Sequence, residues 1–478
     1  MVTSDSSARL QHRRSKILAT VGPASSSPEI LSALIDAGVD AFRVNASHLT
    51  PPEVFQTVTT LRAHIRSIES LVPVVVDVQG PKLRLERMLV PLNITPGARL
   101  PVSYPSSELD DAFSVPFSFN PFAVGLKEGH RVLFADGRIE ASVVSMTNGR
   151  CELLFPSGGV LESRKGVNLP DTLVTLPIID DTDAAVIKAG LDAGAEWFAL
   201  SFVQSAADVE VLRSMVGSDA WVMSKIERPL AVQDLEAIAL VSDAVLVARG
   251  DLGVELPFEE VPLVQREVLD RARALGVPAV CATEMLESMI HQSRPTRAEA
   301  TDVSSAVFDA FDALMLSAET AVGHDPVGAV RAMHRIRSSV EASPRFSRRL
   351  SHMNTFQEFD LPRAAVPSAA VRLAESVGAA AIISLTASGF TARLIAACRP
   401  SVPVLAVTPS ARTASQMNLL WGVTPLVVSR PESTDEAARE ACLAALTLGH
   451  VSAGDRVVVC GSRVGPTADA DAIWVQTL

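Results

Sequence analysis

Polar and ionisable side chains follow six apolar runs of the sequence, at the point where each run ends. The groups are Arg43, Asn45 and Ser47; Asp77, Lys82 and Arg84; Lys225 and Glu227; Arg249, Gly250 and Asp251; Thr283; and Ser317 and Glu319. Carboxylates that leave coordination positions open suit Mg²⁺, which prefers oxygen ligands and keeps substrate oxygens and waters. Converging arginines and lysines suit a phosphoryl group with several negative charges. The turn Gly250-Asp251-Leu252-Gly253 could present backbone N–H groups at a helix start to an anion.

Each of these groups also has a plainer interpretation. A single Arg or Asp at a strand end is more often part of a surface ion pair. Thr283 and Ser317 alone would be turn hydroxyls, Cys281 would be buried packing, and His48 would be polar lining. Their convergence favours a site, because no packing rule demands so many polar groups at one end of successive strands.

The runs that position these groups are rich in β-forming residues and almost wholly apolar. They are Lys16–Gly22, Ala41–Asn45, Val72–Gln79, Trp197–Phe202, Trp221–Ile226, Ala244–Ala248, Val277–Thr283 and Ala313–Ser317. Strands this apolar are typical of a parallel sheet buried on both faces. Helix-length stretches separate most of them, and the first has a capping Ser27, Pro28 at its start and Gly38 at its end. The pattern predicts an α/β fold, a closed (β/α)₈ barrel with its chemistry at the strand ends, with an open doubly wound sheet as the alternative.

Two further regions depart from this alternation. Residues 86–169 contain short alternating runs, including Arg131–Phe134 and Ile139–Val144, and the turn pairs Asp136-Gly137, Asn148-Gly149 and Gly158-Gly159. After the polar stretch that begins near residue 345, a new alternation has helix-like Ala369–Val377 and strand-like Ala381–Leu385, Val404–Val407, Thr424–Val428 and Arg456–Cys460. We expect a barrel from residues 1–85 and 170–344, an inserted small β-barrel lid domain from 86–169, and a C-terminal α/β domain of regulatory type from 345–478.

Composition sets the class of protein. The formal net charge of −12 argues against nucleic acid and anionic membranes as partners, so an anionic substrate needs a local cluster of cations. The five cysteines lack CxxC spacing, which argues against a disulfide framework or a zinc site. The first residues lack the apolar core of a secretory signal, and no apolar run is long enough for a transmembrane helix. A cytoplasmic enzyme is therefore the expectation.

The chain closely resembles pyruvate kinases at the residues singled out above. The matching segments, in the family's order, are KILATVGPASSSPEILSALIDAGVDAFRVNASH, SRKGVNLP, SKIERP, VARGDLGVELP, CATEMLESM, RPTRAEATDV and MLSAET. The resemblance is strong over about residues 15–340 and looser in the C-terminal domain. It implies a glycolytic enzyme that converts phosphoenolpyruvate and ADP to pyruvate and ATP, uses Mg²⁺ or Mn²⁺, and assembles as a homotetramer.

The resemblance also implies a role for each matching residue. The metal ligands correspond to Glu227 and Asp251. The transferred phosphoryl group is faced by Lys225, Arg43 and Arg84. The family's binding site for the substrate carboxylate corresponds to the amides of Arg249, Gly250 and Asp251, together with Thr283. Protonation of the enol carbon is associated with Thr283, Ser317 and Glu319. The nucleotide is expected near Pro23, His48, Arg84 and Lys165, although Pro23 is equally interpretable as a plain turn residue.

One departure from the family pattern bears on a cofactor. The segment DVQGPKLR stands where DTKGPEIR is common, so Lys82 replaces a glutamate. In the common form a potassium ion lies near groups that correspond to Asn45, Ser47, Asp77 and Val78, and family members with lysine here are typically independent of K⁺. We therefore expect that K⁺ is not required, the alternative being that Lys82 only pairs with a neighbouring carboxylate.

The C-terminal domain leaves its ligand open. The loop with Thr386, Ser388, Gly389 and Thr391 could cradle an effector phosphate, as the corresponding family loop does, or Ser388 could simply cap a helix. Asp469 and Asp471 in the last loop disfavour a sugar bisphosphate, so a monophosphate or no effector are both open. Two other functions are alternatives: a metal-dependent lyase or aldolase acting on pyruvate enolates, and a catalytically silent pyruvate kinase paralogue.

Overall fold

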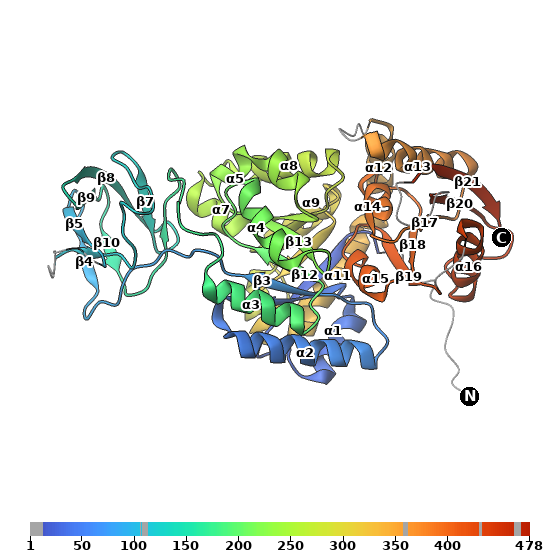
Figure 1. The fold of residues 1–478 in the computed structure, drawn as a ribbon, viewed down its shortest axis with the longest axis horizontal. Coiled ribbons are helices and arrows are strands. Elements are labelled where there is room, and N and C mark those ends of the chain that lie inside the picture. Colours follow the sequence, from blue (N-terminus) through green and yellow to red (C-terminus); the bar gives the residue numbers. More distant parts are fainter. Residues whose placement is uncertain (1–12, 106, 108–112, 357–361, 430–432, 463–469) are drawn as a thin grey trace.

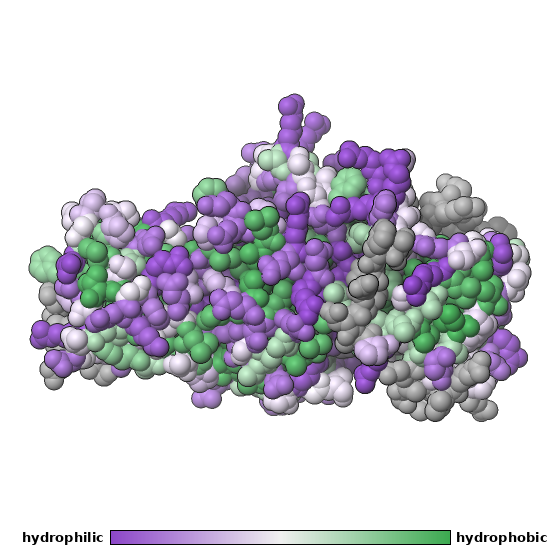
Figure 2. Space-filling model, turned by 90° about the horizontal axis from the view of Figure 1, so that it is seen from above, coloured by the Kyte–Doolittle hydropathy of each residue, from purple (hydrophilic) through white to green (hydrophobic). Residues whose placement is uncertain are grey.

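The computed structural model describes residues 13–105, 107, 113–356, 362–429, 433–462 and 470–478. A β-rich lid lies at one end of the molecule, a barrel at its centre and an α/β domain at the opposite end (Figure 1). No helix in these ranges combines the length and apolarity that crossing a bilayer requires. Hydrophilic and hydrophobic residues are interspersed on the face that Figure 2 shows.

Eight parallel strands close the central barrel in the order β1-β16-β15-β14-β13-β12-β3-β2. They are β1 (Lys16–Val21), β2 (Ala41–Asn45), β3 (Val74–Val78), β12 (Trp197–Leu200), β13 (Trp221–Ile226), β14 (Ala244–Ala248), β15 (Ala279–Ala282) and β16 (Ala313–Leu316). Each lies within one of the predicted apolar runs, so the predicted barrel is confirmed and the open sheet is not the fold.

Helices surround the barrel, and the longer ones pack apolar side chains against the outward faces of the strands. They are α1 (Pro28–Ala37), α2 (Pro51–Ser67), α3 (Asp181–Asp192), α4 (Ala206–Val216), α5 (Pro229–Gln233), α6 (Leu235–Leu240), α7 (Arg249–Glu255), α8 (Val261–Ala274), α9 (Arg297–Phe308), α10 (Ala318–Ala321) and α11 (Pro326–Glu341), with short 3₁₀ turns at η1 (Ala46–His48) and η2 (Glu287–Ile290). The predicted limits of α1 are observed. Ser27 accepts a hydrogen bond from the Ile30 amide, and Gly38 ends the helix at φ 115°.

The lid comprises a six-stranded sheet in the order β11-β7-β8-β9-β5-β6 and a two-stranded sheet of β10 and β4. Its strands are β4 (Leu92–Ile94), β5 (Arg99–Ser103), β6 (Val115–Pro116), β7 (Arg131–Phe134), β8 (Ile139–Thr147), β9 (Arg150–Leu154), β10 (Gly159–Leu161) and β11 (Val167–Asn168). Asn148 and Gly149 form the tight turn between β8 and β9, both with positive φ, as hairpin turns of type I′ require. Gly159 begins β10 instead of forming a turn. A side chain at Gly158 would meet the Ile94 carbonyl at 2.8 Å, so glycine there permits close approach of backbone.

The C-terminal domain has a sheet in the order β19-β18-β17-β20-β21. Its elements are α12 (Pro344–Phe356), η3 (Pro362–Ala364), α13 (Ala365–Val377), β17 (Ala381–Leu385), α14 (Phe390–Ala397), β18 (Val404–Thr408), α15 (Ala411–Met417), β19 (Val423–Val427), α16 (Thr434–Thr447), β20 (Arg456–Gly461) and β21 (Ala472–Thr477). The four strand-like runs predicted from the sequence are present. The antiparallel edge strand β21 was not predicted, and its half-exposed alternating residues give a weaker signal than the buried strands do.

A buried ion pair joins the C-terminal domain to the end of the barrel opposite the strand ends that carry the polar groups. Arg399 places its guanidinium 2.6 Å and 3.1 Å from the two carboxylate oxygens of Asp312, which directly precedes β16. Both side chains are 2% exposed, and the guanidinium also lies 5.2 Å from the ring centroid of Trp421. Removing one partner would leave the other charge buried and unpaired.

We therefore expect Arg399→Met to lower the free energy of unfolding by about 3–5 kcal/mol, the range for breaking a buried ion pair. The matched control is Arg349→Met, because the ion pair of Arg349 with Asp309 is half-exposed and should contribute only about 0–1 kcal/mol. Urea unfolding of both variants measures the difference. Equal midpoints for the two variants would contradict the assignment.

Candidate active site

The Lys225 ammonium lies among the polar groups at the carboxyl ends of three adjacent barrel strands. It is 2.7 Å from Glu227 Oε1, 2.8 Å from Ser201 Oγ and 3.5 Å from Asp77 Oδ1. Successive residues of a strand face opposite sides, so Lys225 shares the inward side of β13 with Met223, whereas Val222 and Ile226 pack outward. Burial alone would lower the pKa of Lys225, but the carboxylates of Asp77 and Glu227 outweigh it and raise that pKa. The ammonium is therefore a fixed positive charge inside the barrel mouth.

Asp77 links this ammonium to a second cation. Its other oxygen lies 2.7 Å from Arg43 Nε, and Arg43 also donates to Thr20 Oγ1 at 3.0 Å. Burial would raise the pKa of Asp77, but Lys225 and Arg43 lower it below its ordinary value. The carboxylate thus holds both cations in position at the end of β3.

The two predicted metal ligands are near each other at the edge of this cluster. Glu227 Oε2 accepts a hydrogen bond from the Phe202 amide at 2.8 Å, and burial raises the pKa of Glu227 to about 7, opposed by Lys225 and reinforced by Asp251. The Asp251 carboxylate has no hydrogen bond or ion pair to any other part of the chain that the structure describes. Two carboxylates that would both gain from an added cation fit Mg²⁺, which uses few protein ligands. A cluster of three or more His, Cys, Asp or Glu side chains suited to a metal is absent from the described ranges.

Asp251 lies in the first turn of α7, next to a strained backbone. The segment 250–253 was predicted as a turn at a helix start, and it lies in the first residues of α7, which begins at Arg249 directly after β14. The Gly250 amide donates to Thr283 Oγ1 at 2.7 Å, and Arg249 Nη2 donates to the Thr283 carbonyl at 2.6 Å. Thr283 has φ 69°, a genuine outlier for a β-branched residue and one typical of functional sites.

Glu319 connects the ends of β15 and β16. Its carboxylate accepts hydrogen bonds from the Ser317 amide at 2.7 Å and from the Leu286 amide at 3.1 Å. The side chain is 3% exposed. It therefore fixes the loops that carry Thr283 and Ser317.

Four other predicted residues lie outside the Lys225 cluster. Arg84 and Lys165 belong to the lid connections, where Arg84 Nη1 donates to the Arg164 carbonyl at 3.3 Å and Lys165 pairs with Glu162 at 3.1 Å. Pro23 is exposed in the turn after β1, and His48 is exposed at the end of η1, which follows β2. In the described part of the chain, none of these four residues forms a hydrogen bond or an ion pair with the Lys225 cluster.

The predicted monovalent-cation region lies beside the cluster. Asn45 and Asp77 are paired in register on β2 and β3, Asn45 Oδ1 accepts from the Ser47 amide at 3.3 Å, and the Val78 carbonyl accepts from the Ser201 amide at 3.3 Å. Lys82 is exposed and lines a cavity between lid and barrel together with Asp251. Its ammonium has no carboxylate within ion-pairing distance in the ranges that the structure describes.

The loop before α14 is organised by its own hydroxyls. Thr386 Oγ1 accepts from the Gly389 amide at 3.0 Å, and Ser388 Oγ accepts from the Phe390 amide at 3.4 Å. Gly389, with φ 85°, is the residue that precedes the helix, and Thr391 is buried. Of the two acids predicted to repel a bisphosphate, Asp469 lies outside the described residues and Asp471 begins the approach to β21.

Sequence reasoning missed two hydroxyls of the site. Ser201 bridges Lys225 and Asp77, and Thr20 bridges Arg43 and the Leu316 carbonyl. Both lie at the inward-facing carboxyl ends of predicted strands, in the same positions as the groups that were found. That placement was the available signal.

Comparisons with known proteins point to one family. The family model "Pyruvate kinase, barrel domain" matches residues 12–330, and "Pyruvate kinase, alpha/beta domain" matches residues 364–475. A pyruvate kinase of Methylorubrum extorquens is 38% identical over 94% of this chain and 93% of its own length. One of Mycobacterium tuberculosis is 37% identical over 98% of each chain. The crystal structure of a pyruvate kinase from Cryptosporidium parvum has a TM-score of 0.90, with 30% identity over 98% of this chain and 96% of that one. The chain belongs to the pyruvate kinase family.

Proposed function

We propose that the Lys225 cluster is the place where this chain transfers a phosphoryl group from phosphoenolpyruvate to ADP, and that Lys82 makes the reaction independent of K⁺. The observation that carries the proposal is the convergence of Lys225, Glu227 and Asp77, with the unpartnered Asp251 carboxylate close by. The family generally uses Mg²⁺, and Glu227 and Asp251 are the residues that would hold it or Mn²⁺. The bound ion supplies charge neutralisation at the phosphoryl and enolate oxygens.

The two fixed cations bind and orient the migrating group. Lys225 and Arg43 are held by Asp77 with their charges directed into the barrel mouth, so they need not reorganise as negative charge spreads over the phosphoryl oxygens. Arg84 joins them from the first lid connection when the lid closes. Closure also excludes water, which would otherwise compete with ADP for the phosphoryl group.

The residues at the other strand ends bind the carboxylate of the substrate and protonate its enol carbon. The amides of Arg249, Gly250 and Asp251 and the Thr283 hydroxyl bind the substrate carboxylate by donating hydrogen bonds to its oxygens. After transfer, a proton reaches the enol carbon through the group around Thr283, Ser317 and Glu319. The nucleotide lies between the lid and the barrel, with Lys165 at its phosphates and Pro23 and His48 near its base.

Lys82 supports independence from K⁺ through its position. Lys82 lines the same cavity as Asp251, and it follows Asp77 and Val78 at the end of β3. The absence of a competing carboxylate partner in the described ranges leaves this charge available to the substrate phosphoryl group. The Lys82 ammonium then supplies the positive charge that a bound K⁺ ion would otherwise supply.

The test is pyruvate release coupled to lactate dehydrogenase, with Mg²⁺ present and K⁺ rigorously omitted. We expect ADP-dependent turnover that disappears on adding EDTA and does not rise when K⁺ is restored. Failure to release pyruvate with ADP and Mg²⁺ would overturn the activity, whereas strong activation by K⁺ would overturn only the role of Lys82. A homotetramer, expected from the resemblance, is measured by sedimentation of the same preparation.

A further inference from the structure

A buried polar network fixes the second connection between the lid and the barrel. Arg228, which is 4% exposed, donates to the Leu169 carbonyl at 2.6 Å, the Thr172 carbonyl at 3.1 Å and Gln204 Oε1 at 2.5 Å. Gln204 in turn hydrogen-bonds the amide and the carbonyl of Val174 at 2.9 Å and 3.0 Å. The chain between lid and barrel is therefore held along its length by two barrel side chains.

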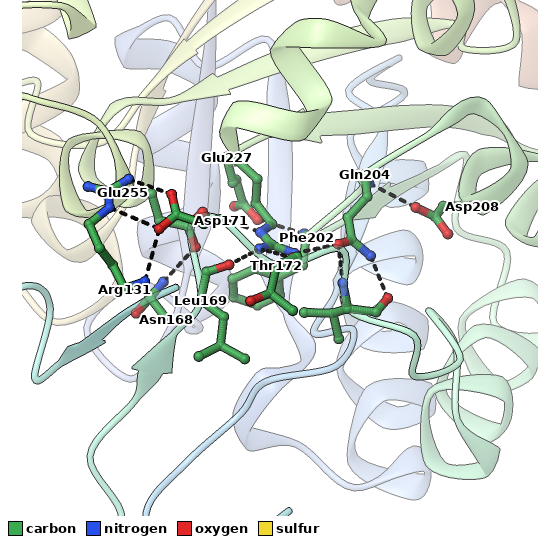
Figure 3. Close-up of polar contacts among 12 residues, drawn as sticks. Arg131, Asn168, Leu169, Asp171, Thr172, Phe202, Gln204, Asp208, Glu227 and Glu255 are labelled. Atoms are coloured by element: carbon green, nitrogen blue, oxygen red, sulfur yellow. Dashed lines mark hydrogen bonds and ion pairs between the residues drawn. The ribbon is translucent and has the colours of Figure 1, made fainter. Parts of the chain in front are cut away.

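The same network reaches the lid sheet itself. Glu255, which is 3% exposed, lies 3.3 Å from Arg228 Nε through one oxygen. Its other oxygen accepts from Asn168 Nδ2 at 3.1 Å, and Figure 3 shows Asn168 next to Glu255. Asn168 belongs to β11, which pairs with β7 in the six-stranded lid sheet. Arg131, the first residue of β7, pairs with Asp171 at 2.8 Å, so the lid sheet and its second connection are tied together.

The barrel members of the network are neighbours of the two proposed metal ligands. Arg228 directly follows Glu227, and Glu255 lies one helical turn after Asp251 on α7. A shift of Asn168 would pull on Glu255, and hence on the short helix that carries Asp251. Breaking the Arg228 contacts would release the chain immediately after Glu227.

An ion pair with a purely structural role would explain why Arg228 and Glu255 are buried, but it would not explain why Asn168 of the lid bonds to Glu255. Asn168 adds nothing to the barrel core, yet it places its amide group on the remaining oxygen of Glu255. The first lid connection is held differently, because Arg84 donates only to the backbone carbonyl of Arg164, itself a lid-side residue, among the contacts of its described side chain. In the ranges that the structure describes, Arg228 and Glu255 are the charged barrel side chains that hydrogen-bond this second connection.

We propose that Asn168, Glu255 and Arg228 couple the orientation of the lid to the geometry of the divalent-metal site. The three are positioning residues, and the inference rests on the proposed assignment of Glu227 and Asp251 as metal ligands. Metal binding then favours one lid orientation, and that lid orientation favours metal binding by the same coupling free energy. A substitution that breaks the coupling therefore changes both the lid response and the metal affinity.

The test replaces Asn168 with alanine, which cuts the lid sheet from Glu255 and leaves the buried Arg228–Glu255 pair intact. Asn93→Ala is the matched control, because Asn93 is an exposed asparagine in the two-stranded lid sheet. Spin labels at Leu89→Cys on the lid and Val211→Cys on α4 report lid position by double electron–electron resonance. Both sites are exposed and the five native cysteines are buried, so the labels react at the introduced thiols. Mn²⁺ affinity of the unlabelled proteins is measured from the resonance of free Mn²⁺.

In the parent protein and in Asn93→Ala, Mg²⁺ with phosphoenolpyruvate should shift the distance distribution. In Asn168→Ala we expect that shift to fall by at least half and the Mn²⁺ dissociation constant to rise about fivefold or more. An unchanged lid response, or an unchanged Mn²⁺ affinity, overturns the coupling, since linkage requires both to change. If Glu227→Gln leaves Mn²⁺ affinity intact, the proposed metal site fails and the coupling fails with it.

Discussion

Replacing Lys225 with methionine should lower kcat for pyruvate formation by about a thousandfold, with the fold retained. The ammonium is held 2.7–3.5 Å from Glu227, Ser201 and Asp77, so it is oriented before substrate arrives. A preorganised charge that meets developing negative charge stabilises the transition state more than the ground state. We therefore expect the loss in kcat to exceed any change in KM for phosphoenolpyruvate.

The matched control for this prediction is Lys188→Met. Lys188 is an exposed lysine on α3 whose partner, Asp192, is also exposed. Its loss should leave kcat within a factor of about two, because surface ion pairs contribute little. Circular dichroism of both variants checks that each is folded. A Lys225→Met enzyme that turns over at the rate of the Lys188→Met enzyme would remove Lys225 from the reaction.

Replacing Lys82 with glutamate should turn a K⁺-independent enzyme into a K⁺-dependent one. Without K⁺ the variant loses the fixed ammonium near Asp251 and gains a negative charge, so we expect its rate to fall about a hundredfold. Added K⁺ should then restore most of the rate, because the groups around Asn45, Ser47, Asp77 and Val78 are still present. The measurement is a K⁺ titration of kcat from a K⁺-free buffer, with the unmodified enzyme alongside.

Lys127→Glu provides the comparison, since Lys127 is an exposed lysine of the lid away from that cavity. Its activity should be insensitive to K⁺ at every concentration, like that of the parent enzyme. A Lys82→Glu variant that stays as active as Lys127→Glu in the absence of K⁺ would show that Lys82 has no such role.

Much of the barrel was predictable because its strands obey a simple rule. Both faces of a barrel strand are buried, so β3 is predicted from the valines of Val74–Val78, and its polar residue, Asp77, appears only near the carboxyl end. The inward alternation then places Val75 and Asp77, or Met223 and Lys225, on one side. The strand ends and their catalytic groups follow from these patterns.

The partners of those groups were not predictable from local pattern. Asp77 and Lys225 are far apart in the chain and meet only because β12 lies between β3 and β13, an order that no single segment specifies. The Arg228, Glu255 and Asn168 network joins three separate elements, and each residue by itself reads as an ordinary polar residue.

Mn²⁺ binding to Glu227→Gln, measured from the resonance of the free ion, tests most directly whether carboxylate-held metal and fixed ammonium groups share one site. We predict at least a tenfold rise in the dissociation constant, with Glu210→Gln, an exposed glutamate of α4, binding as the parent does. Equal Mn²⁺ affinity in the two variants would contradict the placement of the metal beside Lys225.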